Sequence, residues 1–189
     1  MPKLPIGDIG PCIVVWDYPA NQLAIGPYLG TVSLRMVDSV SDVQEEGYGD
    51  APLDGVFAGS VMELDVPMTR SALTQLEKTI AYESMGSLDA AEYIRLQNVA
   101  GCDMYVNAKQ IVIVPICNNV PDSSPLTWFN LYKCHPWRDF ELTWDRSGQR
   151  IHMVKFKIFP NTDSGCGGDY GTEGMPVGSP ALNYSGICT

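Results

Sequence analysis

The chain has 189 residues, of which 45% are hydrophobic and 18% charged, and 12 Lys and Arg against 22 Asp and Glu give a formal net charge of -10. This composition excludes general disorder and suffices for one domain with a sizeable core, while so few charges indicate that part of the surface is buried against another molecule. The negative charge opposes the counterion release by which proteins hold nucleic acid, so we expect any contact with DNA to be non-adhesive.

Alternation of apolar and polar residues is the main local signal, and it predicts strands with one buried face. In the clearest example, Met62, Leu64 and Val66 share one side of a strand. Together with continuous apolar runs, the predicted strands cover residues 12–16, 28–37, 61–66, 111–117, 126–132, 139–144 and 152–158. We therefore expect a mainly β fold, a sandwich or barrel of about seven or more strands.

One helix is predicted beside these strands. Thr69 or Ser71 can cap its first turn, and Leu73, Leu76 and Ile80 then follow at helical spacing. Such a stripe of apolar residues fits a single α-helix flanking the open face of a sheet.

Two segments lack a regular pattern. Residues 39–59 are rich in Asp, Glu and Gly and form either a long loop or an extended hairpin arm. Residues 161–189 are rich in glycine and poor in apolar anchors, which is typical of an extended C-terminal arm. The expected organisation is one β domain over residues 1–160 and an arm over residues 161–189.

Targeting and redox signals are weak. The N-terminus lacks the features of a signal peptide, and no apolar run approaches the roughly 20 residues of a membrane span. We expect a protein made in the cytosol that binds no membrane. The six cysteines form no C-x-x-C pair and are expected to be mostly free thiols: Cys12, Cys102, Cys117, Cys134, Cys166 and Cys188.

The histidines give little support for catalysis. Only His135 and His152 are present, and Cys134 precedes the first of them. Adjacent strand residues point to opposite faces, so Cys134 and His135 are not expected to form a nucleophile and base pair. Neither histidine has further ligands at zinc spacing nearby, and we expect no cofactor and no metal.

The carboxylates and aromatics leave alternatives open. Eight acidic residues lie between Met36 and Thr69 without one Lys or Arg, but their spacing is not that of a calcium loop, and a solvated acidic loop is the simplest interpretation. A glycosidase-like pair of carboxylates is the alternative. The aromatic residues could form either a carbohydrate platform or part of the core: Trp128, Phe129, Trp137, Phe140 and Trp144.

The predicted elements follow one another in an order that is typical of a known protein family. Its parts are a strand opening at 10–14, an acidic stretch with a Gly-Asp-Ala-Pro turn at 45–54, the Ala58-Gly59 step, the alternating strand at 61–66 and the helix at 71–80. In this order the chain resembles the major tail tube proteins of long-tailed, siphophage-like bacteriophages. Residues 140–145 and 154–161 are similar to the closing hairpin of that family, with Asn161 where an Asp is usual.

The resemblance implies a structural protein of the virion and not an enzyme. Subunits of that family form hexameric rings that stack into a tube, and the DNA passes through a negatively charged lumen without specific binding. The implied partners are other copies of the chain and the tape measure, terminator and baseplate proteins of the tail. Assembly would take place in the host cytoplasm.

The resemblance also implies site residues. The contacts between subunits or rings would come from the acidic loop, through Asp42, Glu45, Glu46, Tyr48, Asp50 and Pro52. The charges facing the lumen would come from the polar sides of two strands, through Glu63, Asp65, Asp139 and Glu141.

Three other functions remain open from the sequence. A tail-terminator or baseplate protein would form a ring that does not extend. A carbohydrate- or receptor-binding β module would stay monomeric or trimeric and expose its tryptophans. A hydrolase with paired carboxylates would lose its activity on substitution of a single Asp or Glu.

Overall fold

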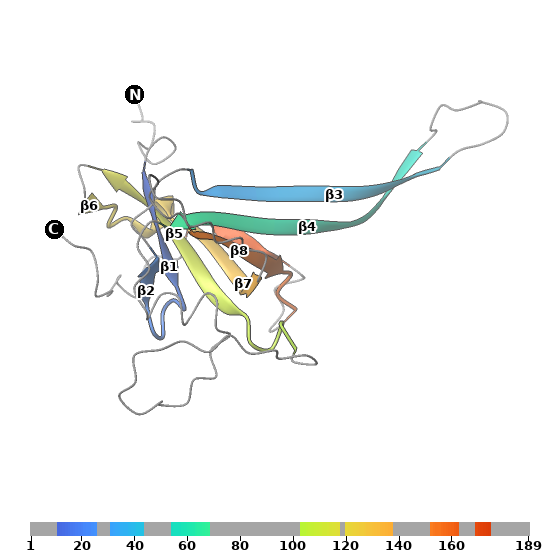
Figure 1. The fold of residues 1–189 in the computed structure, drawn as a ribbon. Coiled ribbons are helices and arrows are strands. Elements are labelled where there is room, and N and C mark those ends of the chain that lie inside the picture. The colour runs from blue at the N-terminus through green and yellow to red at the C-terminus, as the bar shows by residue number, and fades with distance from the viewer. Residues whose placement is uncertain are drawn as a thin grey trace, which may run out of the picture.

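The computed structural model describes residues 11–25, 31–43, 54–68, 103–117, 120–137, 152–162 and 169–174 (Figure 1). These residues form β1 Cys12–Trp16, β2 Leu23–Ile25, β3 Ser33–Val43, β4 Asp54–Met68, β5 Lys109–Cys117, β6 Val120–Pro121, β7 Phe129–Trp137, β8 His152–Phe159 and β9 Gly171–Glu173, with a 3₁₀ turn at Pro125–Thr127. The mainly β fold predicted from the sequence is confirmed. No helix in this part of the chain is long and apolar enough to cross a bilayer.

All nine strands belong to one antiparallel sheet. The main order is β2-β1-β5-β7-β8-β4-β3, with β6 added to β5 and β9 added to β7. Both β8 and β9 pair antiparallel with β7, β8 along residues 133–137 and β9 along residues 129–131. β8 and β9 therefore both pair with the same edge of β7. An isolated β-bridge between Asn161 and Asp169 pairs the chain just after β8 with the chain just before β9.

The sheet is strongly curved. Trp16 of β1 and Phe156 of β8 have ring centroids 5.3 Å apart, although β5 and β7 lie between their strands. In a flat sheet those strands would be about 14 Å apart, because neighbouring strands are spaced by about 4.8 Å. The concave face encloses the main core: Val14, Trp16, Ile25, Met62, Leu64, Val66, Met68, Ile111, Leu131, Cys134, Val154, Phe156 and Ile158.

A second cluster covers the opposite face of β1 and β5: Ile13, Val15, Tyr18, Ala24, Val112, Val114 and Trp128. The indole N–H of Trp128 donates to the Asp122 carbonyl oxygen over 2.8 Å, so the buried ring keeps a hydrogen-bond partner. Because both faces of these strands are buried, their sequences are continuous apolar runs without alternation.

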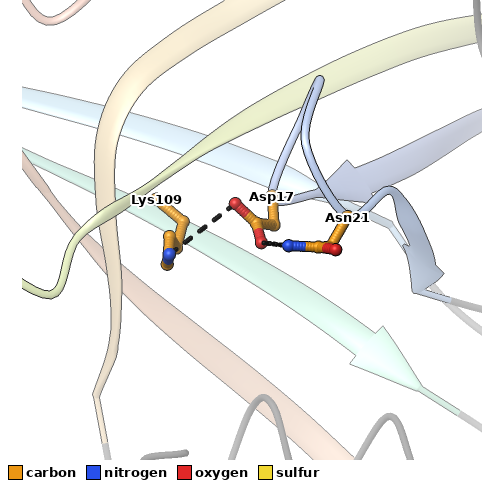
Figure 2. Close-up of polar contacts among 3 residues, drawn as sticks. All are labelled: Asp17, Asn21 and Lys109. Atoms are coloured by element: carbon orange, nitrogen blue, oxygen red, sulfur yellow. Dashed lines mark hydrogen bonds and ion pairs between the residues drawn. The ribbon is translucent and has the colours of Figure 1, made fainter.

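The turn that joins β1 to β2 depends on Asp17. This residue has φ of 54°, a conformation that Asp tolerates better than most residues. Its carboxylate accepts a hydrogen bond from Asn21 Nδ2 at 3.2 Å and lies 3.9 Å from Lys109 Nζ, as Figure 2 shows. The turn is thus linked to the first residue of β5.

Part of the glycine-rich C-terminal segment belongs to the β domain. β9 pairs with β7, and Tyr170 packs against the main core. A Cβ atom at Gly171 would collide with the Asn130 carbonyl oxygen, so only glycine allows this close pairing. Residues 163–168 and 175–189 of that segment, the predicted helix at 71–80 and the predicted strand at 139–144 lie outside the described residues.

Candidate assembly interface

β3 and β4 continue beyond the rest of the sheet as a two-stranded ribbon, formed by residues 37–43 and 54–61 (Figure 1). β4 pairs with β8 only from Met62 to Met68, and within the described residues its first eight positions pair only with β3. At about 3.3 Å per residue, eight residues carry the ribbon roughly 26 Å outward. The segment 39–59, interpreted from the sequence as a loop or a hairpin arm, is a hairpin arm in its described parts.

A β-bulge marks the root of the ribbon. Ser39 pairs with Gly59 and Val40 pairs with Phe57, so Ala58 has no partner opposite it on β3. Gly59 has φ of 137°, which a side chain would oppose. The Ala58-Gly59 step in the sequence therefore lies within the ribbon, a few residues outward of Met62, where the pairing of β4 with β8 ends.

Hydrogen bonds from two directions hold this root. The hydroxyl of Ser60 donates to Asp38 Oδ1 across the two strands at 2.7 Å. The hydroxyl of Tyr170 donates to the Ser60 carbonyl oxygen at 2.5 Å. The direction of the ribbon is thus linked to the C-terminal segment that carries β9.

The ribbon exposes apolar side chains on both faces. Val40 and Phe57 form a cross-strand pair and are 57% and 62% exposed. Val37 and Val61 form a pair on the other face and are also exposed. A two-stranded ribbon is marginal in water, and exposed apolar surface on both of its sides is typical of an interaction site.

The outer edge of β3 adds a second binding feature. Within the described residues β3 pairs only with β4 and ends the sheet. An edge strand of 11 residues presents unpaired backbone N–H and C=O groups to another chain.

The end of the ribbon is acidic. Of the predicted contact residues, Asp42 lies here, exposed and opposite Gly55. Asp54 begins β4 and accepts the Gly55 N–H at 2.8 Å. The other predicted contact residues lie outside the described part: Glu45, Glu46, Tyr48, Asp50 and Pro52. The sequence from 42 to 54 contains no Lys or Arg.

Glu63 and Asp65, predicted to face the lumen, lie on the face of the sheet opposite the main core. Glu63 pairs with Lys157 on one side and Arg35 on the other, and Asp65 pairs with Lys155. Lys133 of β7 lies on this face as well, opposite Phe159. We call Arg35, Lys133, Lys155 and Lys157 the basic strip. Asp139 and Glu141 lie outside the described residues.

The basic residues outnumber Glu63 and Asp65 on this face, so these two carboxylates alone do not make a negative lining. Their role in a lumen stays a prediction. The face was not identified from the sequence because its members belong to four strands that only the register brings together.

Aromatic rings lie at the border of the basic strip. Lys157 Nζ is 5.4 Å from the centre of the Trp137 ring, and Lys133 Nζ is 4.9 Å from that of Tyr105. Trp137 is 41% exposed, whereas Trp128 is buried in the second cluster. The described tryptophans thus do not line up as one carbohydrate platform, and Trp144 lies outside the described residues.

Cys134 and His135 point apart, as predicted. The thiol of Cys134 is in the main core, where burial raises its pKa. His135 is buried on the other face, where burial lowers its pKa, partly offset by its hydrogen bond of 2.8 Å to the Pro136 carbonyl oxygen. Neither environment favours the thiolate and imidazolium of a cysteine nucleophile.

No metal centre is evident in the part of the chain that the structure describes, where no three His, Cys, Asp or Glu side chains gather closely enough to hold an ion. His152, the second of the two histidines considered from the sequence, begins β8, and its side chain lies outside the described part.

The chain matches no protein-family model and no curated protein. Among solved structures, it is similar to a chain in the six-fold symmetrised cryo-EM structure of the anti-feeding prophage baseplate. That alignment has a TM-score of 0.46 and 12% identity and covers 79% of this chain and 87% of the other. An alignment at this TM-score does not establish a common fold.

Proposed function

We propose that this chain is a structural subunit of a phage tail, which assembles with copies of itself into stacked hexameric rings that form a tube. The observation that carries the proposal is the β3–β4 ribbon. It extends from the sheet, exposes apolar pairs on both faces and ends the sheet with an edge strand.

The exposed apolar surface and the open edge of the ribbon need a partner. Covering half-exposed Val or Phe side chains gains on the order of 1 kcal/mol each. Pairing the edge of β3 with another chain would satisfy its backbone groups and protect the edge from disordered aggregation. Both gains are available only in an assembly.

The sequence resemblance supports a second copy of this chain as the partner. Two parts of the tail tube pattern meet at the ribbon: the acidic stretch at 45–54 connects its strands, and the Ala58-Gly59 step forms its bulge. The acidic stretch and the Ala58-Gly59 step, which carry the resemblance, thus belong to the same ribbon that requires a partner.

The net charge of -10 fits a channel for DNA. A negative lumen repels phosphates, so that the genome can pass without adhering. The chain would act without catalysis, as a component of the virion assembled in the host cytoplasm together with tape measure, terminator and baseplate proteins.

Sedimentation velocity over a wide concentration range tests this proposal. A tube subunit passes from monomer to polymers whose size keeps growing with concentration. A terminator or baseplate ring stops at one closed species, and a carbohydrate- or receptor-binding module stays monomeric or trimeric. Either of the last two results would overturn the tube proposal.

A further inference from the structure

The described basic residues are strongly segregated. Apart from Lys109, they all belong to the basic strip, on the face opposite the main core: Arg35, Lys133, Lys155 and Lys157. Arg35 is exposed and the three lysines are partly exposed. A concentration of positive charge in a chain of net charge -10 indicates an acidic partner.

This chain carries such an acidic surface at the end of its own ribbon. Asp42 and Asp54 lie there on neighbouring strands, and both are exposed. The basic strip lies at the root of the same ribbon, where Glu63 is flanked by Arg35 and Lys157.

The two surfaces are too far apart to meet within one chain. Nine residues separate Asp54 from Glu63 along β4, which is about 30 Å in an extended strand. The ribbon extends away from the sheet, bends near its outer end and does not fold back on the sheet (Figure 1). Contact between these surfaces therefore requires a second copy.

We propose that the acidic end of the ribbon of one copy docks on the basic strip of the next copy. This inference rests on the proposed function and identifies the surface that receives the ribbon. The contact joins two different surfaces, so it repeats from copy to copy and produces a ring or a filament instead of a closed pair. The charges set its direction and register, while the apolar pairs of the ribbon supply affinity.

The same strip is poorly suited to DNA. Glu63 and Asp65 lie between its basic residues in cross-strand register, and they would oppose a phosphate backbone laid along the sheet. An acidic protein segment with discrete carboxylates can instead align with the separate lysines. In this arrangement Glu63 and Asp65 are residues of the subunit contact, in place of the lumen role that the resemblance implies.

Charge exchange tests the contact. The strip variant K155E/K157E and the ribbon-end variant D42K/D54K each place like charges in the contact. The concentration at which each begins to assemble should rise by at least about tenfold. An equimolar mixture of the two should assemble again, because each ribbon end then meets a strip of opposite charge.

Two further variants guard against misfolding. Reversal of Lys155 and Lys157 places like charges opposite Asp65 and Glu63, so the neutral K155Q/K157Q variant is tested beside it, with circular dichroism as the check of folding. K109Q neutralises a lysine outside the strip without placing a second carboxylate beside Asp17, and it should assemble like the wild type.

The outcomes separate the two proposals. If the wild type assembles, and K155E/K157E and K155Q/K157Q assemble as well as it does, the docking contact is overturned. The proposed function then still stands. Wild-type protein that never assembles would overturn both. Fluorescence anisotropy showing a labelled DNA duplex bound by the wild-type strip but not by K155Q/K157Q would assign the strip to nucleic acid and overturn the contact.

Discussion

The hydroxyl of Tyr170 donates to the carbonyl oxygen of Ser60, 110 residues away in the sequence. This hydrogen bond joins the C-terminal segment to the root of the ribbon, one residue from the bulge at Gly59. The ribbon can be oriented for assembly only if its root is fixed, and Tyr170 is one of the residues that fix it.

Replacing Tyr170 with Phe removes this hydrogen bond and keeps the ring that packs on the core. The free energy of unfolding should fall by about 1 kcal/mol, and amide hydrogen exchange should accelerate around Ser60. The matched control is Tyr132→Phe, whose hydroxyl makes a long, exposed contact of 3.5 Å with Thr172. Equal effects of the two substitutions on exchange at Ser60 would contradict the role of Tyr170.

Substitutions at two phenylalanines distinguish an effect on folding from an effect on assembly. Phe156 is fully buried, and Phe156→Ala should lower the free energy of unfolding by about 3–5 kcal/mol in chemical denaturation. Phe57 is exposed on the ribbon, and Phe57→Ala should change monomer stability by less than about 0.5 kcal/mol. The same Phe57 variant should need a higher concentration to assemble, measured by light scattering. Unchanged assembly would remove the apolar faces of the ribbon from the interface.

The acidic segment between the strands of the ribbon is tested by the triple variant E45K/E46K/D50K. The monomer should keep its circular dichroism spectrum and its unfolding transition, because surface charges contribute little to folding. Polymerisation should be blocked, since the end of the ribbon would then carry the wrong charge for its contact. Glu173→Lys, on the exposed strand β9, is the control and should leave assembly intact. Normal polymers from the triple variant would refute the contact role of this segment.

His135 predicts a loss of stability in mild acid. Burial lowers its pKa in the folded protein below its ordinary value of 6.5, so the unfolded state takes up a proton more readily. Above pH 6.5 the titration of His135 does not change the free energy of unfolding. As the pH falls from 6.5 through the folded-state pKa, the unfolded state binds the proton first, and the free energy of unfolding decreases. Denaturation at pH 7.5 and pH 5 should show a smaller loss for His135→Asn than for the wild type. An equal loss in both proteins would contradict the burial of a neutral imidazole.

Alternation identified the core of this fold well. Met62, Leu64 and Val66 were predicted to share a face, and all three are buried in the main core. Val154, Phe156 and Ile158 behave in the same way. The prediction succeeds because the pleat fixes the direction of successive side chains whatever the strand pairs with.

Strand ends were harder to predict. The strand expected at 28–37 is observed at Ser33–Val43, because its second half is polar and is held as a strand by pairing with β4. The strand expected at 126–132 is observed at Phe129–Trp137, after a 3₁₀ turn at Pro125–Thr127. Pairing and turns outweigh local pattern at such positions.

The assembly surfaces were only partly visible in the sequence. The acidic stretch around Asp50 stood out because its charges lie close together in the chain. The basic strip did not, since Arg35, Lys133 and Lys157 come from separate strands and become neighbours only through the register of the sheet. The three-residue strand β9 offered too short a pattern to detect.

Negative-stain electron microscopy of the purified protein at high concentration tests the central claim most directly. Long tubes of uniform width with a stain-filled central channel are the predicted result. Dispersed monomers, or single closed rings that never stack, would contradict the account of this chain as a tube subunit.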